Sequence, residues 1–341
     1  MAYVNHVLLY GVLKLQLNDV LTDSAIRYTR TLMDALRREL EISFNFSSLN
    51  EKSSEGVVRR LKIIHEIISG PTKLLTTPAL DEHYRHVPRV DRKNFLHWLV
   101  DSYRSVAERN IRLIYPPGHP DHLPATRDDF ALADASANAY YLPAYHLIYV
   151  PGSILLPPFL TAVVPDAFNY GALGKVLAHE LTHAFEPESL DVNYAVEPDL
   201  MYTPRLKDKV QKQYDCLLIQ AGALAGNAFA DRRTASETFA DNAGTELAYL
   251  TYSALAEAKR SKGVAGLTPD QTFFAATCFI FCGADDQKEV RSKAYLPLKL
   301  RCNQPLLNTE QFASAFRCAR GAPMRPSTRC DIHTTRVVSR R

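Results

Sequence analysis

The stretch Leu177-Ala178-His179-Glu180-Leu181-Thr182-His183 decides the fold, because it places an H-E-x-x-H pattern inside a helix predicted near residues 171–186. Residues four apart share one helix face, so the two imidazoles can bind a single Zn²⁺. Glu180 then lies near the open side of the metal, where its carboxylate can take a proton from a water that attacks a peptide carbonyl. Alone, the pattern also fits two solvated or hydrogen-bonded histidines on an amphipathic helix.

A second stretch offers the third ligand that a catalytic zinc requires. It reads Thr234-Ala235-Ser236-Glu237-Thr238-Phe239-Ala240-Asp241-Asn242, with Glu237 and Asp241 on one helix face. A Glu ligand with an Asp four residues later can bind zinc and hold the far ring nitrogen of a ligand histidine. Taken alone, Thr234-x-x-Glu237 can also be explained as a capping box at the start of a helix. The joint occurrence with H-E-x-x-H favours the metal site.

A third, uncharged stretch precedes the metal helix, and it predicts strand, turn and strand from Ala139 to Val164. Asn138-Ala139-Tyr140-Tyr141 opens it, and a strand there could pair with an extended peptide. The alternative is an ordinary buried strand. Longer helices are expected on either side of this stretch, at Ala25–Leu40, Val57–Ile68, Phe95–Ile114, 206–222, 234–258 and 309–317.

The composition bounds the class of protein. The chain has 341 residues, 46% of them hydrophobic and 23% charged, which is typical of about two globular domains. A net charge of +3 gives no case for a nucleic-acid partner. The apolar stretch Val7–Leu13 lacks a preceding basic segment, so we interpret it as the start of a helix, not a signal peptide. No transmembrane segment is expected, because the longest uncharged stretch, 135–165, contains five prolines.

Together these stretches resemble the neprilysin and endothelin-converting enzyme family of zinc metallopeptidases. The family pattern runs N-A-[FY]-Y, P-A-G-I-L-x-P-P-F, H-E-[IL]-T-H-x-F, E-N-x-A-D-N-x-G and F-x-x-A-F-x-C. The chain matches it in order and spacing over about residues 125–341, at Asn138–Tyr141, Pro151–Phe159, His179–Phe185, Glu237–Gly244 and Phe312–Cys318.

The resemblance implies a role for each matching residue. The zinc ligands would be His179, His183 and Glu237, with Glu180 as general base and Asp241 supporting a ligand histidine. The residues implied in substrate binding are Asn138 and Ala139 for the peptide backbone, Arg301 for a substrate carbonyl, and Ile154, Phe159, Val176 and Phe281 for an apolar pocket that favours a large hydrophobic residue after the scissile bond.

The chain departs from the family pattern at several positions. Tyr295 stands where the family has the histidine that stabilises the oxyanion, so its hydroxyl is a possible donor. Glu186-Pro187 replaces an acidic pair, and Ser236 replaces a glycine. Family members usually run to about twice this length, and the first residues here resemble the middle of such a chain.

The six cysteines, all in the C-terminal part, favour disulfides in an oxidising compartment. By resemblance Cys216 would pair with Cys330. Cys282 and Cys318 match positions whose family partners are missing here, so they are left to pair with each other, with Cys278 or Cys302, or with nothing.

The expected fold is mainly α with a small β component. It comprises a thermolysin-like zinc metallopeptidase catalytic domain at 115–341 and, at 1–114, a helical region resembling part of the family's second domain. The expected function is a zinc-dependent endopeptidase, with one Zn²⁺ per chain. It would hydrolyse oligopeptides on the amino side of hydrophobic residues, using zinc-activated water and Glu180 as general base. The alternative is a weak or inactive relative that binds peptides or a partner. By resemblance the location is extracellular or at the plasma membrane.

Overall fold

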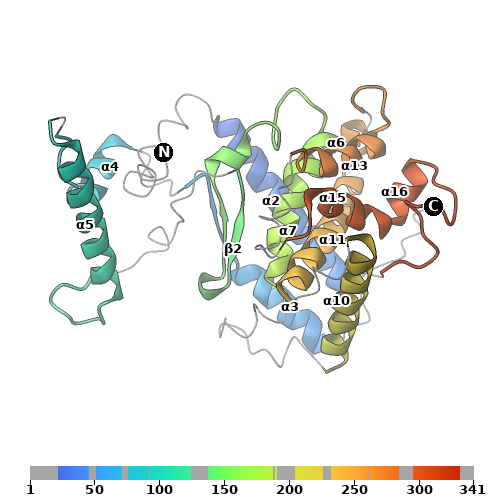
Figure 1. Cartoon of the computed structure of the whole chain (residues 1–341), viewed down its shortest axis with the longest axis horizontal. Helices are drawn as coiled ribbons and strands as arrows, with labels where there is room; N and C mark the ends of the chain where they lie inside the picture. The colour runs from blue at the N-terminus through green and yellow to red at the C-terminus, as the bar shows by residue number, and fades with distance from the viewer. Residues whose placement is uncertain are drawn as a thin grey trace.

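The computed structural model describes most of the chain, and the fold is mainly α with one small sheet (Figure 1), as predicted. Two helices lie at its centre. α7 (Lys175–His183) carries the H-E-x-x-H pattern, and α11 (Arg232–Ser253) packs along it. The described residues are 22–45, 51–70, 76–91, 93–123, 137–186, 189, 204–225, 232–260, 262–283 and 295–330.

The other elements surround this pair. α2, α10, α13 and α15 cover it, and α16 follows them near the C-terminus (Figure 1). Their bounds are α2 Asp23–Asn45, α3 Glu51–Ile63, β1 His65–Ile68, α4 Thr77–His83, α5 Phe95–Ile114, β2 Tyr140–Leu142, η3 Pro143–Tyr145, β3 Leu147–Val150, η4 Gly152–Leu155, α6 Asp166–Asn169, η5 Tyr170–Gly174, α10 Pro204–Ala225, α12 Glu257–Arg260, α13 Pro269–Phe279, α15 Leu298–Leu307 and α16 Glu310–Ala315.

The contact between α7 and α11 is unusually close, because it passes through Gly244. A Cβ atom at that position would lie 2.7 Å from the backbone nitrogen of His179 and 2.9 Å from its Cα. Only a glycine lets the two backbones approach this far. The glycine thereby brings the residues of α11 one and two turns before it within reach of the histidines of α7.

The sheet has the order β1-β3-β2 and corrects one prediction. The helix expected at Val57–Ile68 ends at Ile63, and the last four residues form β1 instead. β1 pairs in parallel with β3, Ile68 opposite Val150, while β2 pairs antiparallel with β3. An apolar residue every four positions fits a helix, but a parallel partner 82 residues away in sequence outweighs that local preference. Within the described residues, β2 is an edge strand.

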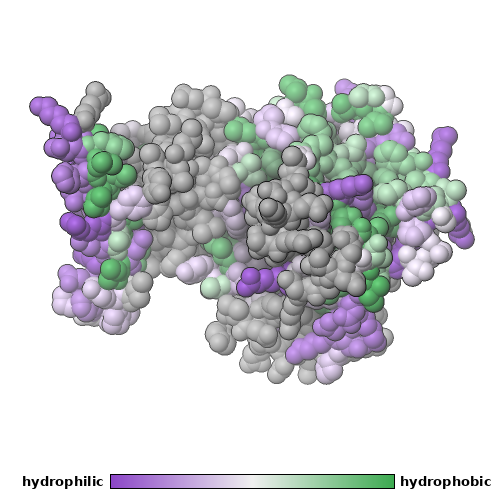
Figure 2. Space-filling model, viewed as in Figure 1, coloured by the Kyte–Doolittle hydropathy of each residue, from purple (hydrophilic) through white to green (hydrophobic). Residues whose placement is uncertain are grey.

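The first helices share the core of α7. Leu32, Met33 and Leu36 of α2 are fully buried in the same cluster as Leu177 and Leu181 of α7. By contrast, α4 and α5 lie to one side of this body (Figure 1). Hydrophilic residues gather over the outer side of α5 and over α10 (Figure 2). The division into 1–114 and 115–341 stays a prediction.

Two disulfides join elements in the C-terminal part. Cys216 of α10 bonds Cys330, the pairing that the family resemblance implies, with 5.7 Å between their Cα atoms. Cys278 of α13 bonds Cys302 of α15. Cys282 and Cys318 carry free thiols. The open question of the four remaining cysteines therefore resolves into one bridge and two thiols.

The expectation of no membrane-spanning segment can be compared with the described helices. None of them combines the length and the apolar character that crossing a bilayer requires. The uncharged stretch near 135–165 folds, from residue 137 onward, as short strands and turns. The N-terminal stretch Val7–Leu13 lies outside the described residues.

We predict that Gly244→Ala destabilises the protein by about 1–3 kcal/mol, because the new methyl group meets backbone atoms that cannot rotate away. The matched control is Gly174→Ala, also helical, where a Cβ meets no atom nearer than 3.6 Å. Alanine's higher helix propensity should leave that variant at least as stable as the wild type. Thermal unfolding measures both, and equal midpoints for the two variants would contradict the prediction.

Candidate active site

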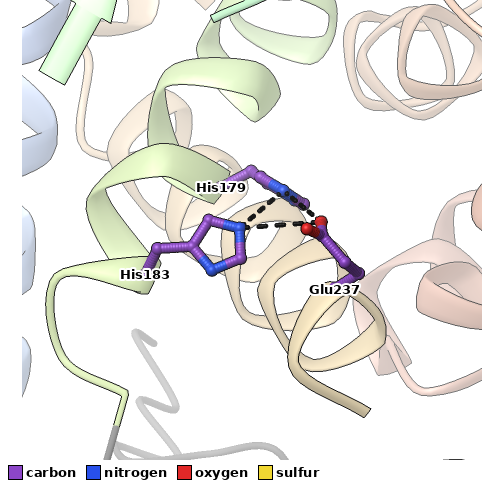
Figure 3. Close-up of side chains that lie close together, drawn as sticks. All are labelled: His179, His183 and Glu237. Atoms are coloured by element: carbon purple, nitrogen blue, oxygen red, sulfur yellow. Dashed lines mark hydrogen bonds and ion pairs between the residues drawn. The ribbon is translucent and has the colours of Figure 1, made fainter. Parts of the chain in front are cut away.

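Three side chains from α7 and α11 meet at one point, as the helical spacing predicts (Figure 3). The Nε2 atoms of His179 and His183 lie 3.0 Å apart. Glu237 Oε2 lies 3.2 Å from Nε2 of His179 and 3.6 Å from Nε2 of His183. The described residues contain no other group of three such donors.

The donor set fits a zinc ion. Tetrahedral ligand atoms about 2.0–2.1 Å from zinc lie about 3.3 Å from each other, close to the three separations found here. Glu237 Oε2 is buried and makes no hydrogen bond of acceptable geometry, although both imidazoles are near. The two Nε2 atoms lie within hydrogen-bonding distance of each other, and the carboxylate oxygen beside them lacks a partner that a metal ion would supply. Two imidazoles and one carboxylate are also a ligand set that leaves a fourth position open.

Each histidine has a carboxylate beside its other ring nitrogen. Asp241 Oδ1 lies 3.1 Å from Nδ1 of His179. Glu186 Oε2 lies 3.0 Å from Nδ1 of His183 and accepts a hydrogen bond from the Ser236 hydroxyl at 2.7 Å. Such carboxylates fix the ring orientation and turn the Nε2 lone pair toward the metal.

The carboxylates of this cluster are held ionised by neighbouring cations. Burial opposes ionisation of Asp241, but Arg301, Lys175 and His179 together outweigh it and hold the pKa of Asp241 below its ordinary range. The Arg301 guanidinium donates to both oxygens of Asp241, at 2.7 and 2.9 Å. Burial likewise opposes ionisation of Glu237, yet the two histidines lower its pKa to about 2.

Glu180 differs from these carboxylates. It is buried, and burial raises its pKa above the ordinary value. Its Oε2 accepts a hydrogen bond from the main-chain N–H of Tyr141, at 2.6 Å. A carboxylate with a raised pKa, held in place by one donor, suits proton transfer near neutral pH.

A cavity of about 210 Å³ adjoins the cluster of His179, His183 and Glu237. It brings together most of the residues expected in substrate binding. Ala139 does not line it, and its side chain is buried at the start of β2. Arg301 is expected to bind a substrate carbonyl, but its guanidinium donates two hydrogen bonds to Asp241. The expected residues in the lining are Asn138, Ile154, Phe159, Val176, Phe281, Tyr295 and Arg301.

Three contributors to the site were not predicted from the sequence. The Tyr141 N–H carries no side-chain signal, since it acts through the backbone. Glu186 stands three residues after His183, so its helical spacing could have indicated a partner for that imidazole. Lys175 precedes His179 by one turn and lines the cavity, which its position on the metal-binding face could have indicated.

Comparison with known proteins places the chain in a family. Residues 138–332, more than half of the chain, match the model of peptidase family M13. Human endothelin-converting enzyme 1 is 26% identical over 83% of this chain and 37% of its own length. Human membrane metallo-endopeptidase-like 1 is 27% identical over 97% of this chain and 43% of its own length.

The fold agrees with this assignment. A zinc metalloprotease of Mycobacterium tuberculosis, solved with an inhibitor, superposes with a TM-score of 0.71 at 22% identity, covering 93% of this chain and 48% of that one. The chain thus spans less than half the length of these curated relatives. On these grounds the chain belongs to peptidase family M13, the neprilysin and endothelin-converting enzyme family, and has its thermolysin-like metallopeptidase fold.

Proposed function

We propose that this chain carries the catalytic site of a zinc-dependent endopeptidase that hydrolyses oligopeptides. The observation behind the proposal is the convergence of His179, His183 and Glu237 on one point, with the Glu180 carboxylate buried beside them. The three converging residues would hold the zinc. The chemistry that zinc supplies in such a site is Lewis-acid polarisation of a water molecule and of a carbonyl oxygen.

Glu180 is the general base of the proposed reaction. Its carboxylate accepts a proton from the attacking water and then donates it to the leaving amine nitrogen. The Tyr141 N–H holds Oε2 at 2.6 Å, so the side chain keeps one orientation during the transfer. Burial raises the pKa of Glu180, which favours the protonated form that the second transfer requires.

The substrate would lie along β2 and the cavity. Asn138 and Ala139 precede this edge strand, where an extended peptide can add backbone hydrogen bonds. The apolar side chains of Ile154, Phe159 and Val176 favour a large side chain after the scissile bond. Tyr295 lines the same cavity, and burial raises the pKa of its hydroxyl, so this hydroxyl stays protonated as a donor to the oxyanion.

The assignment to peptidase family M13 also supports proposals for the domains, the compartment, the partner and the metal stoichiometry. We place the catalytic domain at 115–341, with 1–114 as part of a second, helical domain. Two disulfides favour an oxidising compartment, consistent with an extracellular or membrane-surface location. The partner is a peptide, and the metal stoichiometry is one Zn²⁺ per chain.

We predict that Glu180→Gln lowers peptide cleavage by about 10²–10⁴-fold, because glutamine cannot take a proton from water. The zinc content should not change, since Glu180 is not among the three converging donors. The measurement is cleavage of a short peptide with internal Phe or Leu, beside metal analysis of the same sample. Glu108→Gln, on the exposed part of α5, is the control. Undiminished cleavage by Glu180→Gln would exclude the general-base role.

The same assay decides the alternative function. A wild-type chain that holds one zinc and binds the peptide without cleaving it would favour a peptide-binding protein. The departure that motivates this alternative is Tyr295, which replaces the usual histidine donor.

We predict that Glu237→Ala loses stoichiometric zinc after dialysis, because only two ligands remain. Metal analysis and the shift of the thermal midpoint on zinc addition both measure this loss of zinc binding, independently of activity. Glu257→Ala, an exposed position on α12, should bind zinc like the wild type. Equal zinc content in the two variants would rule out Glu237 as a ligand.

We predict that Glu186→Ala weakens zinc binding by about 10–100-fold without abolishing it, because the His183 ring loses its orienting partner. Competition with a chelator measures the affinity. Ser236→Ala removes only the hydroxyl that contacts Glu186, so a smaller effect is expected there. An affinity unchanged by Glu186→Ala would show that His183 is oriented by other contacts.

A further inference from the structure

The cavity beside the three converging residues contains a buried cation that an apolar pocket would not have. Lys175 lines it together with Phe159, Val176 and Phe281. The side chain of Lys175 is only 2% exposed, so its ammonium group has been almost completely removed from water. Removing an ammonium group from water is costly unless acceptors replace its hydration shell.

The protein replaces that hydration shell only in part. The ammonium donates to the Arg301 carbonyl oxygen at 3.3 Å, and its next acceptor, Asp241 Oδ1, lies 4.0 Å away. Asp241 is already engaged, because it accepts two hydrogen bonds from the Arg301 guanidinium. An ammonium group has three donors. Among the described residues, Lys175 therefore keeps donor capacity that a ligand could use.

Two cations lie near the ring of Phe281 at the inner end of the cavity. The Lys175 ammonium lies 4.2 Å from the centre of this ring, and the Arg301 guanidinium lies 4.8 Å from it. Both cations lie beside Asp241, and the lining of the cavity also includes the Glu180 carboxylate. Burial lowers the pKa of Lys175 to about 8, with Asp241 opposing the shift. The ammonium form still predominates at pH 7.

We propose that this pocket accepts a substrate side chain with an apolar stem and a terminal carboxylate, best met by glutamate, and that Lys175 determines this specificity. The inference rests on the proposed peptidase function and refines it. The side chains of Phe159 and Val176 contact the methylene groups of the stem. The carboxylate supplies the acceptor that Lys175 lacks, and an ionised partner makes that hydrogen bond a strong one.

The test compares peptides that differ only at the residue after the scissile bond, which is Glu, Gln, Met or Lys. Wild type and Lys175→Met are assayed with zinc at pH 7. Methionine is about as long as the lysine stem and as the whole glutamate side chain, so each change removes charge with little change of volume. We expect the wild type to favour Glu over Met by about tenfold in kcat/KM, and Lys175→Met to shift that ratio by about 10–100-fold toward Met.

Lys212→Met controls for the loss of one positive charge, because Lys212 is exposed on α10, far from the cavity lining. It should keep the wild-type ratio. A Glu-to-Met ratio that is the same in wild type and Lys175→Met overturns the proposal. If Lys175→Met does not fold, the wild-type series decides, and a wild type that does not favour Glu over both Gln and Met overturns it.

A second readout separates this inference from the proposed function. Zinc-loaded Glu180→Gln, with and without Lys175→Met, is titrated with the same peptides carrying a fluorescent label. If the wild type cleaves no peptide, the hydrolytic function fails. The binding ratio still tests Lys175 in that case, and a preference for Glu that disappears with Lys175→Met supports it. A ratio that does not change overturns it.

Discussion

The close approach of α7 and α11 at Gly244 is the constraint on which the site depends. With no Cβ between the two backbones, α11 lies beside His179 closely enough for its acidic side chains to reach the imidazoles. The helices run antiparallel, so Asp241 meets the start of α7, near Lys175 and His179, while Glu237 meets both histidines. A wider spacing would separate each of these pairs at once.

That packing concentrates charge in a place with little water, and the arrangement is stable because each group has a partner. Asp241 lies between Arg301 and His179, and Glu186 lies between His183 and Ser236. Removing one member of such a set leaves a buried charge uncompensated, which is more destabilising than replacing the whole set. Glu180 is the exception, since its support is a backbone N–H and its pKa is raised. The carboxylate that we propose as the general base is thus held differently from the others.

The sequence predicts the parts of the site that follow from helix periodicity. His179 and His183 share a face, as do Glu237 and Asp241, and their meeting needs only two packed helices. The sequence does not predict contacts set by packing between distant segments, such as the pairing of Arg301 with Asp241 or the parallel pairing of β1 with β3. Ile64 and Ile68 are four positions apart, a spacing that places them on one side of a strand as well as on one face of a helix. Glu186 is an intermediate case. Its spacing from His183 can be read from the sequence, but its contact with Ser236, 50 residues away, cannot.

Arg60 of α3 shows why the first helices belong to the same argument. Its side chain is fully buried, and its guanidinium donates to the carbonyl oxygen of Ala184, directly after His183, and to the hydroxyl of Tyr141 at 3.3 Å. It therefore links the end of α7 to the strand whose N–H holds Glu180. Arg60 thus contacts both the segment after His183 and the strand that holds Glu180, so residues before 70 contribute to the geometry of the candidate site. The candidate site is consequently a property of the packed chain, including the helices that carry none of the three converging residues.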